Sequence, residues 1–436
     1  MEYRYLIDIA LILFSTKLLG LVTRKFNLPQ VVGALLAGLI FGPACLNILH
    51  SSELLETFSE LGVIVLMFTA GLTTDIKELK SAGKSGFLVA LSGVIVPLIM
   101  GTAVGFLFNK SQGENTTIHI YQNIFIGVIL TATSVSITVE ALKELGKFST
   151  KVGNTILAAA IIDDVLGLIC LTVVTSLGGN TDVSIPLMLL KIVLFCAFVI
   201  VFGFAANKFM GWYAKRLKNK HLQRFPILAF IFCLVFAYCS EEFFGVADIT
   251  GAFAVGVALS TTQEAPYIEN RFRPLEYLLL TPIFFAGIGL KVQITNFNGT
   301  ILVITIAVCL TAIISKFIGC GIGAKLCGLS AGDSMRVGIG MFCRGEVALI
   351  VANKGASMGL MHESFMAPVV IMVVLCAIIT PVLLKLSYRG ESSYAGMETS
   401  KLAERLDVSE QLDAINRQLL DTERRMRGDK EDSERE

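Results

Sequence analysis

Charged residues are scarce in this chain of 436 residues. Asp, Glu, Lys and Arg together make up 16% of it, whereas about 25% is usual for a soluble domain. Hydrophobic residues reach 54%, and the mean hydropathy is +0.72. Apolar runs of about 20 residues, each long enough to cross roughly 30 Å of hydrocarbon as a helix, recur along the sequence. The composition therefore excludes a soluble globular protein and indicates a membrane protein.

Residues that would indicate other chemistry are equally sparse. The four histidines fall near predicted helix ends, and the ten cysteines include no CxxC pair, so we expect neither a bound metal nor a disulfide framework. No GxGxxG motif follows a predicted strand, and a net charge of +1 gives no argument for nucleic-acid binding. We therefore expect no cofactor, no nucleic-acid partner and no enzymatic activity.

Hydropathy and turn signals predict about thirteen transmembrane helices. The first run follows MEYRY without a basic region or a small-residue cleavage site, so we interpret it as a retained helix and not as a signal peptide. The predicted spans are 4–23, 28–46, 54–74, 85–108, 121–144, 153–178, 184–209, 224–242, 246–262, 274–291, 299–324, 333–355 and 364–387.

Basic residues alternate between the predicted connections. Odd-numbered connections contain lysine and arginine, from Arg24 and Lys25 in the first to Lys325 in the eleventh, and even-numbered ones contain almost none. The positive-inside rule then places the N-terminus outside and the C-terminus in the cytoplasm. Thirteen helices also allow two inverted six-helix repeats around one linker helix. We predict an all-α polytopic membrane protein.

The tail at 389–436 has a different composition, rich in charge. Apolar residues recur at roughly helical spacing between Leu402 and Leu419, which predicts a short amphipathic or coiled helix. A solvated and partly disordered end is the alternative.

The stretch ILAAAIIDDVLGLICL places two adjacent carboxylates, Asp163 and Asp164, near the middle of a predicted span. A charged side chain there costs roughly 2.5–3.5 kcal/mol on insertion scales, so such residues usually face a cavity or partner and mark an ion pathway. Neighbouring helix positions point about 100° apart, so the two carboxylates can have different partners. Lys316 reaches a similar depth on an antiparallel helix and is the expected counter-charge. A lysine that snorkels to the interface is the alternative.

Two predicted spans contain stretches that favour unwound backbone. They are TATSVS at 131–136 and GIGMFCRGE at 338–346. Unwound segments at membrane depth occur where they line protein or a water-filled cavity, and their free carbonyls can bind cations. Besides the aspartates, we expect hydroxyl ligands at position 132 and at Ser134. The charges expected to compensate the half-helix ends are Glu140, Arg344 and Glu346. A helix contact lined by small residues is the alternative for each stretch.

Four motifs in combination resemble one transporter family. TATSVSI, AAIIDDVLGLI, ISKFIG and CRGEVALI are similar to motifs of the monovalent cation:proton antiporter-2 family, over about residues 5–388. The likeness is to its bacterial sodium/proton antiporters and to the membrane part of glutathione-gated potassium efflux systems. It implies that Asp164 binds the ion, that Asp163 forms a salt bridge with Lys316, and that unwound segments cross at 131–136 and about 340–345.

The resemblance also implies a domain arrangement, a homodimer in the bacterial plasma membrane, and an elevator-like motion of a mobile core. The domains it implies are a dimerisation domain at 1–82 and 211–292, a core ion-transport domain at 83–178 and 293–388, a linker helix at 179–210 and a cytoplasmic tail at 389–436.

The expected activity is secondary active exchange of Na⁺, with Li⁺ as a further candidate, for protons. Burial raises the pKa of a carboxylate and a nearby cation lowers it, so such a site can be emptied by protonation. The aspartate pair with a buried lysine resembles electrogenic members of the superfamily, and the short tail departs from the potassium efflux relatives. K⁺/H⁺ exchange or potassium efflux is the alternative. A channel, an organic-anion symporter and a receptor or scaffold without transport are weaker alternatives.

Overall fold

The computed structural model describes residues 4–25, 28–109, 116–178, 185–217, 224–292 and 299–389. All regular elements in these ranges are helices, as predicted. The helix predicted in the tail lies outside the described residues, as does the first part of the predicted linker helix.

The helices follow one another with short connections. The first eight are α1 (Arg4–Lys25), α2 (Gln30–Phe41), α3 (Glu53–Thr73), α4 (Ile76–Phe108), α5 (Thr116–Ile129), α6 (Val135–Glu144), α7 (Lys151–Gly178) and α8 (Ile185–Leu217). The others are α9 (Arg224–Glu242), α10 (Asp248–Leu259), α11 (Ala265–Leu275), the π-helix η1 (Glu276–Leu280), α12 (Thr281–Leu290), α13 (Gly299–Leu326), α14 (Ala331–Met341), α15 (Glu346–Ser357), the 3₁₀ helix η2 (Glu363–Phe365) and α16 (Met366–Ser387).

Eight of the described helices are long and apolar enough to cross a membrane. They are α1, α3, α4, α7, α8, α9, α13 and α16, and the shorter apolar helices α2, α5, α10 and α15 come between them. The chain is therefore a multi-pass membrane protein. The exact count of thirteen spans stays a prediction, since four of the predicted spans contain more than one helical element.

Both spans predicted to be interrupted are interrupted. Five residues separate α5 from α6, and four residues separate α14 from α15. Each interruption is shorter than the sequence suggests, because Ser136 already lies in α6 and Gly338 and Gly340 still lie in α14. The two glycines allow close packing instead of unwinding: a Cβ at Gly338 would lie 2.7 Å from the carbonyl oxygen of Phe317, and one at Gly340 would lie 2.5 Å from the Ile156 side chain.

Other helix boundaries differ from the prediction for local reasons. α4 begins nine residues before the predicted start at 85 because the Asp75 side chain accepts a hydrogen bond from the amide of Lys77 at 2.7 Å and caps the helix. The predicted span 28–46 ends as a helix at Phe41, and the chain turns there. The predicted span 274–291 is formed by the end of α11 together with η1 and α12.

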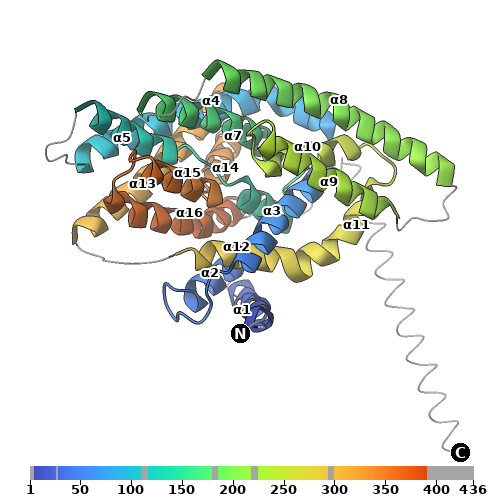
Figure 1. The fold of residues 1–436 in the computed structure, drawn as a ribbon, viewed down its shortest axis with the longest axis horizontal. Coiled ribbons are helices and arrows are strands. Elements are labelled where there is room, and N and C mark those ends of the chain that lie inside the picture. Colours follow the sequence, from blue (N-terminus) through green and yellow to red (C-terminus); the bar gives the residue numbers. More distant parts are fainter. Residues whose placement is uncertain are drawn as a thin grey trace, which may run out of the picture. The chain divides into compact units, whose positions relative to one another are not determined.

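The site described below is built on the packing around α4. α4 packs against α13, α7 and α5, while α14 contacts α7, α13 and α16. In Figure 1, α14 and α15 accordingly lie between α7 and α16. The largest hydrophobic cluster joins these helices, and it includes residues of both interrupted spans. The two helix interruptions are therefore surrounded by packed helices.

A second cluster joins α3, α8, α9, α10 and α11. α8 contributes little to it, because most of its apolar side chains are exposed, including Ile200 and Phe204. An apolar surface of this size is typical of a helix that faces lipid. The helix runs along one edge of the described part in Figure 1.

The α2–α12 contact depends on glycine. A Cβ at Gly38 would overlap the carbonyl group of Ala286, and one at Gly289 would lie 2.5 Å from the amide nitrogen of Leu39. Backbones that approach this closely leave no room for a side chain, which is a common way for helices to associate in membranes.

The substitution Gly38→Ala should therefore destabilise the protein. Overpacking of this kind costs about 1–3 kcal/mol, and the clash is with backbone that cannot rotate away. Thermal denaturation in detergent should show a lower Tm. Gly211→Ala is the matched control, because a Cβ there has no atom within 4 Å, and its Tm should stay at or above the wild-type value. An unchanged Tm for Gly38→Ala would contradict the close contact.

Candidate functional site

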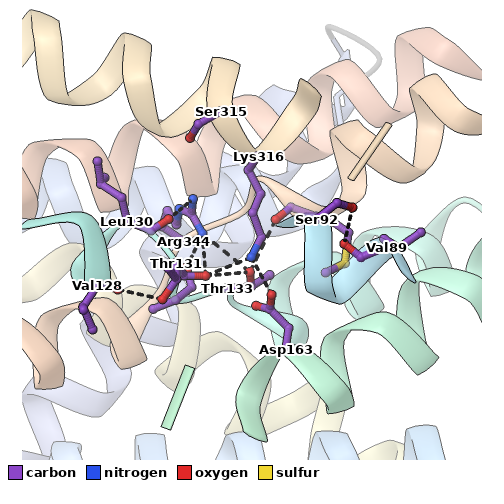
Figure 2. A network of polar contacts seen from close by, with 12 residues as sticks. Val89, Ser92, Val128, Leu130, Thr131, Thr133, Asp163, Ser315, Lys316 and Arg344 are labelled. Carbon is purple, nitrogen blue, oxygen red and sulfur yellow. Dashed lines mark hydrogen bonds and ion pairs between the residues drawn. The ribbon is translucent and has the colours of Figure 1, made fainter. Parts of the chain in front are cut away.

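A buried ion pair joins α13 to α7. The Nζ atom of Lys316 lies 2.6 Å from Oδ1 of Asp163, and the two side chains are 0% and 1% exposed. Lys316 therefore does not snorkel to a surface, and its predicted pairing with Asp163 is present. The second oxygen of Asp163, Oδ2, is buried and accepts no hydrogen bond from the described residues. Figure 2 shows the lysine reaching down to the carboxylate between the helices.

The same ammonium group binds one of the interrupted helices. Lys316 Nζ donates a hydrogen bond of 2.9 Å to the carbonyl oxygen of Thr131, in the break that follows α5. Three segments that are distant in sequence thus meet at one nitrogen. An ammonium buried this completely is tolerated because a carboxylate and a carbonyl together satisfy it.

Asp164 has a different environment from its neighbour. It is half-buried, and so are residues 165–170 of α7, whereas Asp163 is 2% exposed. The two carboxylates therefore face different directions, as expected for adjacent positions on a helix. Gly167 lies on the face of α7 that Asp164 shares, and a Cβ there would lie 4.0 Å from Oγ1 of Thr131. The half-buried part of α7 that contains Asp164 and Gly167 thus passes beside the interruption after α5.

Arg344 compensates the carboxyl end of α5. Its side chain is fully buried, and one guanidinium nitrogen donates to the carbonyl oxygen of Leu130 at 2.5 Å. The other donates to the carbonyl oxygens of Thr131, at 3.3 Å, and Ala132. Carbonyl groups at the end of a helix have no partner within it and carry the negative end of its dipole. A cation there is the expected compensation, and Arg344 lies where the sequence predicts it.

Hydrogen bonds hold the two breaks together. The amide of Ser134 donates to the carbonyl oxygen of Cys343 at 2.9 Å, and the Thr138 hydroxyl donates to the carbonyl oxygen of Gly340 at 2.8 Å. Gly345 is required at this contact, because a Cβ there would lie 2.5 Å from the Ser134 hydroxyl. The unwound segments therefore lie against each other, and the predicted crossing is present.

The expectation of a hydroxyl ligand at position 132 is wrong. That position is Ala132, which offers only its backbone carbonyl, and the neighbouring hydroxyls belong to Thr131 and Thr133. The Thr131 hydroxyl donates to the carbonyl oxygen of Val128 at 2.7 Å. Ser134, the other predicted ligand, lies at the crossing, with its hydroxyl 3.2 Å from that of Ser136.

Glu140, one of the two remaining predicted charges, is not brought to the Lys316–Asp163 pair. Glu140 lies in α6, and its charged neighbours are Lys143, Glu276 and Glu144. Glu346 begins α15, and its side chain lies outside what the structure describes. Compensation of the crossing by these two carboxylates therefore stays a prediction.

Sequence reasoning missed Gly93, which makes room for the lysine. A Cβ at Gly93 in α4 would lie 2.5 Å from Sγ of Cys320 and 3.5 Å from Cε of Lys316. Because α4 packs against both α13 and α7, a larger residue would meet the lysine where it crosses between them. The available signal was the GxxxG spacing of Gly319 and Gly323 on α13, which is typical of close helix pairs.

Gly93→Ala should lower the Tm, because its methyl group would displace the Cys320 thiol. The expected cost is about 1–3 kcal/mol. Adding Cys320→Ala removes the closest atom and should restore most of the lost Tm, since the remaining contacts with Lys316 are ordinary van der Waals distances. Gly83→Ala, on the same helix with no atom within 4 Å of its Cβ, is the control. A double variant no more stable than Gly93→Ala would argue against this mechanism.

Comparison with known proteins finds relatives along most of this chain. Residues 10–386 match the family model described as "Sodium/hydrogen exchanger, transmembrane". The Na(+)/H(+)-K(+) antiporter GerN of Bacillus cereus is 38% identical over 402 residues, which cover 92% of this chain and 100% of that protein. The Na(+)/H(+) antiporter of Enterococcus hirae is 38% identical over 380 residues, which cover 86% of this chain and 96% of that protein.

The fold also has a counterpart among solved structures. The sodium proton antiporter MjNhaP1 of Methanocaldococcus jannaschii aligns with 91% of this chain and 100% of its own, with a TM-score of 0.63 at 20% sequence identity. A likeness at this level of identity concerns the fold alone. With the family model matching most of its length, the chain belongs to the transmembrane sodium/hydrogen exchanger family.

Proposed function

We propose that this protein is a secondary active antiporter that exchanges Na⁺ for protons. The observation that carries the proposal is the buried Lys316–Asp163 pair beside the half-buried Asp164, next to two interrupted helices. Relatives named as Na⁺/H⁺ antiporters support the same pair of substrates. The family is one of transporters, and we propose no enzymatic activity for this member.

In this proposal Asp164 is the group for which Na⁺ and protons compete. Ionised, it would hold the cation together with oxygens of the crossing, among them that of Ser134, and with Oδ2 of Asp163, which has no hydrogen-bond donor among the described residues. Unwound backbone and carboxylates form cation sites of this kind in other transporters. Protonated, Asp164 would lose its attraction for Na⁺. Alternate exposure of one such site to the two sides couples the two fluxes.

The Lys316–Asp163 pair is proposed to make the exchange electrogenic. A cation bound near Asp163 would weaken the attraction of that carboxylate for the ammonium. Lys316 could then release its proton and take it up again after the cation leaves. Two protons would cross for each Na⁺, so one positive charge would move per cycle.

The larger arrangement is also proposed. The parts at 83–178 and 293–388 would form a core that moves like an elevator against a dimerisation domain at 1–82 and 211–292, with 179–210 as the linker. Thirteen spans in two inverted repeats, a homodimer surrounded by lipid, and a bacterial plasma membrane with the N-terminus outside complete the proposal. The family membership and the MjNhaP1-like fold support it.

K⁺ is a second candidate substrate. The GerN protein, which aligns over its whole length, is named as an Na⁺/H⁺–K⁺ antiporter. The test is dequenching of a pH-sensitive dye in proteoliposomes on addition of Na⁺, Li⁺ or K⁺ in turn. Na⁺ should give the largest response. A response to none of the three ions would overturn the proposal. A response to K⁺ alone would show that K⁺, and not Na⁺, is exchanged for protons.

Asp164→Asn should abolish exchange while the protein stays folded, because the amide keeps the volume of the carboxylate and cannot be ionised. Proton movement driven by Na⁺ in proteoliposomes is the measurement, with size-exclusion profiles as the check on folding. Asp75→Asn is a matched control: that side chain caps α4, and asparagine caps a helix as well as aspartate. Near wild-type rates in Asp164→Asn vesicles would remove Asp164 from the site.

Lys316→Gln should leave slow exchange that does not respond to membrane potential. It should also lower the Tm, because breaking a buried ion pair costs about 3–5 kcal/mol when one charge remains. Asp163 would relieve part of this cost by binding a proton. The measurement is the rate of exchange under an imposed potential.

The same experiment has two outcomes that would contradict the coupling. A wild-type rate that does not change with potential would rule out electrogenic exchange. A Lys316→Gln variant as sensitive to potential as the wild type would show that another group carries the second proton.

A further inference from the structure

A second polar cluster lies apart from the crossing, where the last turns of α6 meet α3 and η1. Lys143 Nζ lies 3.2 Å from the Thr69 hydroxyl and 3.5 Å from Oε1 of Glu276. The Thr69 hydroxyl lies 3.0 Å from Oε2 of the same glutamate. We call these three residues, together with Glu140, the α6 cluster. All four are wholly or mostly enclosed by protein.

The α6 cluster contains two carboxyl groups and one ammonium group. Glu140 has Lys143 and Glu276 as charged neighbours, and its Oε2 atom is buried without a hydrogen-bond partner among the described residues. Among the described residues of the cluster, the ammonium group of Lys143 contacts only Glu276 and Thr69, so Glu140 is a charged neighbour and not a bonded one. The next carboxylate along, Glu144, has other partners, because it accepts hydrogen bonds of 2.7 and 2.8 Å from the amide of Gln30. Within the cluster, Oε2 of Glu140 is therefore the oxygen that is still open to a further partner.

The contacts of Lys143 are long for charged groups. Charge-assisted N–H···O bonds are usually about 2.7–2.9 Å, whereas its ion pair with Glu276 measures 3.5 Å. The ammonium therefore interacts with its oxygen partners without binding any of them tightly. A group held this loosely can be displaced by another cation.

The backbone around the cluster is specialised. Gly146, at a φ of +64°, ends α6 just after Lys143. Glu276 begins a π-helix, a distortion that often occurs at functional sites. The ammonium of Lys17 lies 3.3 Å from the ring centroid of Tyr277, which holds the start of the π-helix against α1.

We propose that the α6 cluster is a transient binding site for the transported monovalent cation, in which the Lys143 ammonium occupies the cation's place in this structure. The ligands would be carboxylate oxygens of Glu140 and Glu276 and the hydroxyl oxygen of Thr69. Lys143 lies at the fifth predicted connection, which the charge asymmetry places on the cytoplasmic side. The cluster therefore binds the cation on its way between the cytoplasm and Asp164, and this role rests on the proposed exchange.

The test is the KM for Na⁺ in everted membrane vesicles, in which the cytoplasmic face is exposed to the added ion. Glu276→Gln and Glu140→Gln should each raise the KM about three- to tenfold, by weakening the attraction for a cation a few ångströms away. Lys143→Gln should lower the KM, because it removes the competing ammonium. A structural disturbance alone would not produce opposite signs. Lys151→Gln, which removes an exposed charge from the same connection, should leave the KM within twofold of wild type.

A second measurement does not depend on transport. In the Asp164→Asn background, Na⁺ should still raise the Tm, and adding Glu276→Gln should abolish that rise. Shifts of the KM in the same direction for Lys143→Gln and Glu276→Gln, or no shift in either, would overturn the proposal that the α6 cluster binds the cation. Wild-type vesicles that move no protons, together with a Glu276-dependent rise of the Tm, would overturn the exchange proposal and support cation binding by the cluster.

Discussion

Two interruptions of the helical backbone release carbonyl groups in a part of the protein where water is scarce, and these groups need donors. The carbonyl oxygens of Leu130, Thr131 and Ala132 have lost their intrahelical partners, and two buried cations supply the missing donors. An unsatisfied carbonyl in such a place would cost several kcal/mol. The arrangement of α13, which brings Lys316, and of α14, which precedes Arg344, is therefore tied to the break after α5.

The Thr131 carbonyl is shared between these two cations, and they differ in a way that matters. An arginine keeps its charge in any protein environment, whereas a lysine can lose its proton when it is buried. If Lys316 becomes neutral, Arg344 still donates to the same oxygen. In the proposed electrogenic cycle, the crossing would thus keep its structure when Lys316 releases its proton.

Much of this could be predicted from the sequence because the membrane restricts where polar residues can lie. The depth of Lys316 relative to Asp163 followed from helix directions, and the breaks followed from small and hydroxylated residues in apolar runs. The ends of the breaks could not be predicted, since Gly338 and Gly340 serve packing with Phe317 and Ile156 and not unwinding. The α6 cluster could not be predicted from the sequence either. Its members come from three separate helices and form no motif, and only the tertiary packing brings them together.

α6 is attached at both ends. At its amino end, Ser134 is bonded to the backbone of the other broken span, and at its carboxyl end the Glu144 carboxylate binds the amide of Gln30 at the start of α2. Between these attachments lie ten helical residues, a rod of about 15 Å at 1.5 Å per residue. A helix this short bends little. A shift of the crossing would therefore reach the Glu144–Gln30 contact, where the proposed core meets α2 of the proposed dimerisation domain.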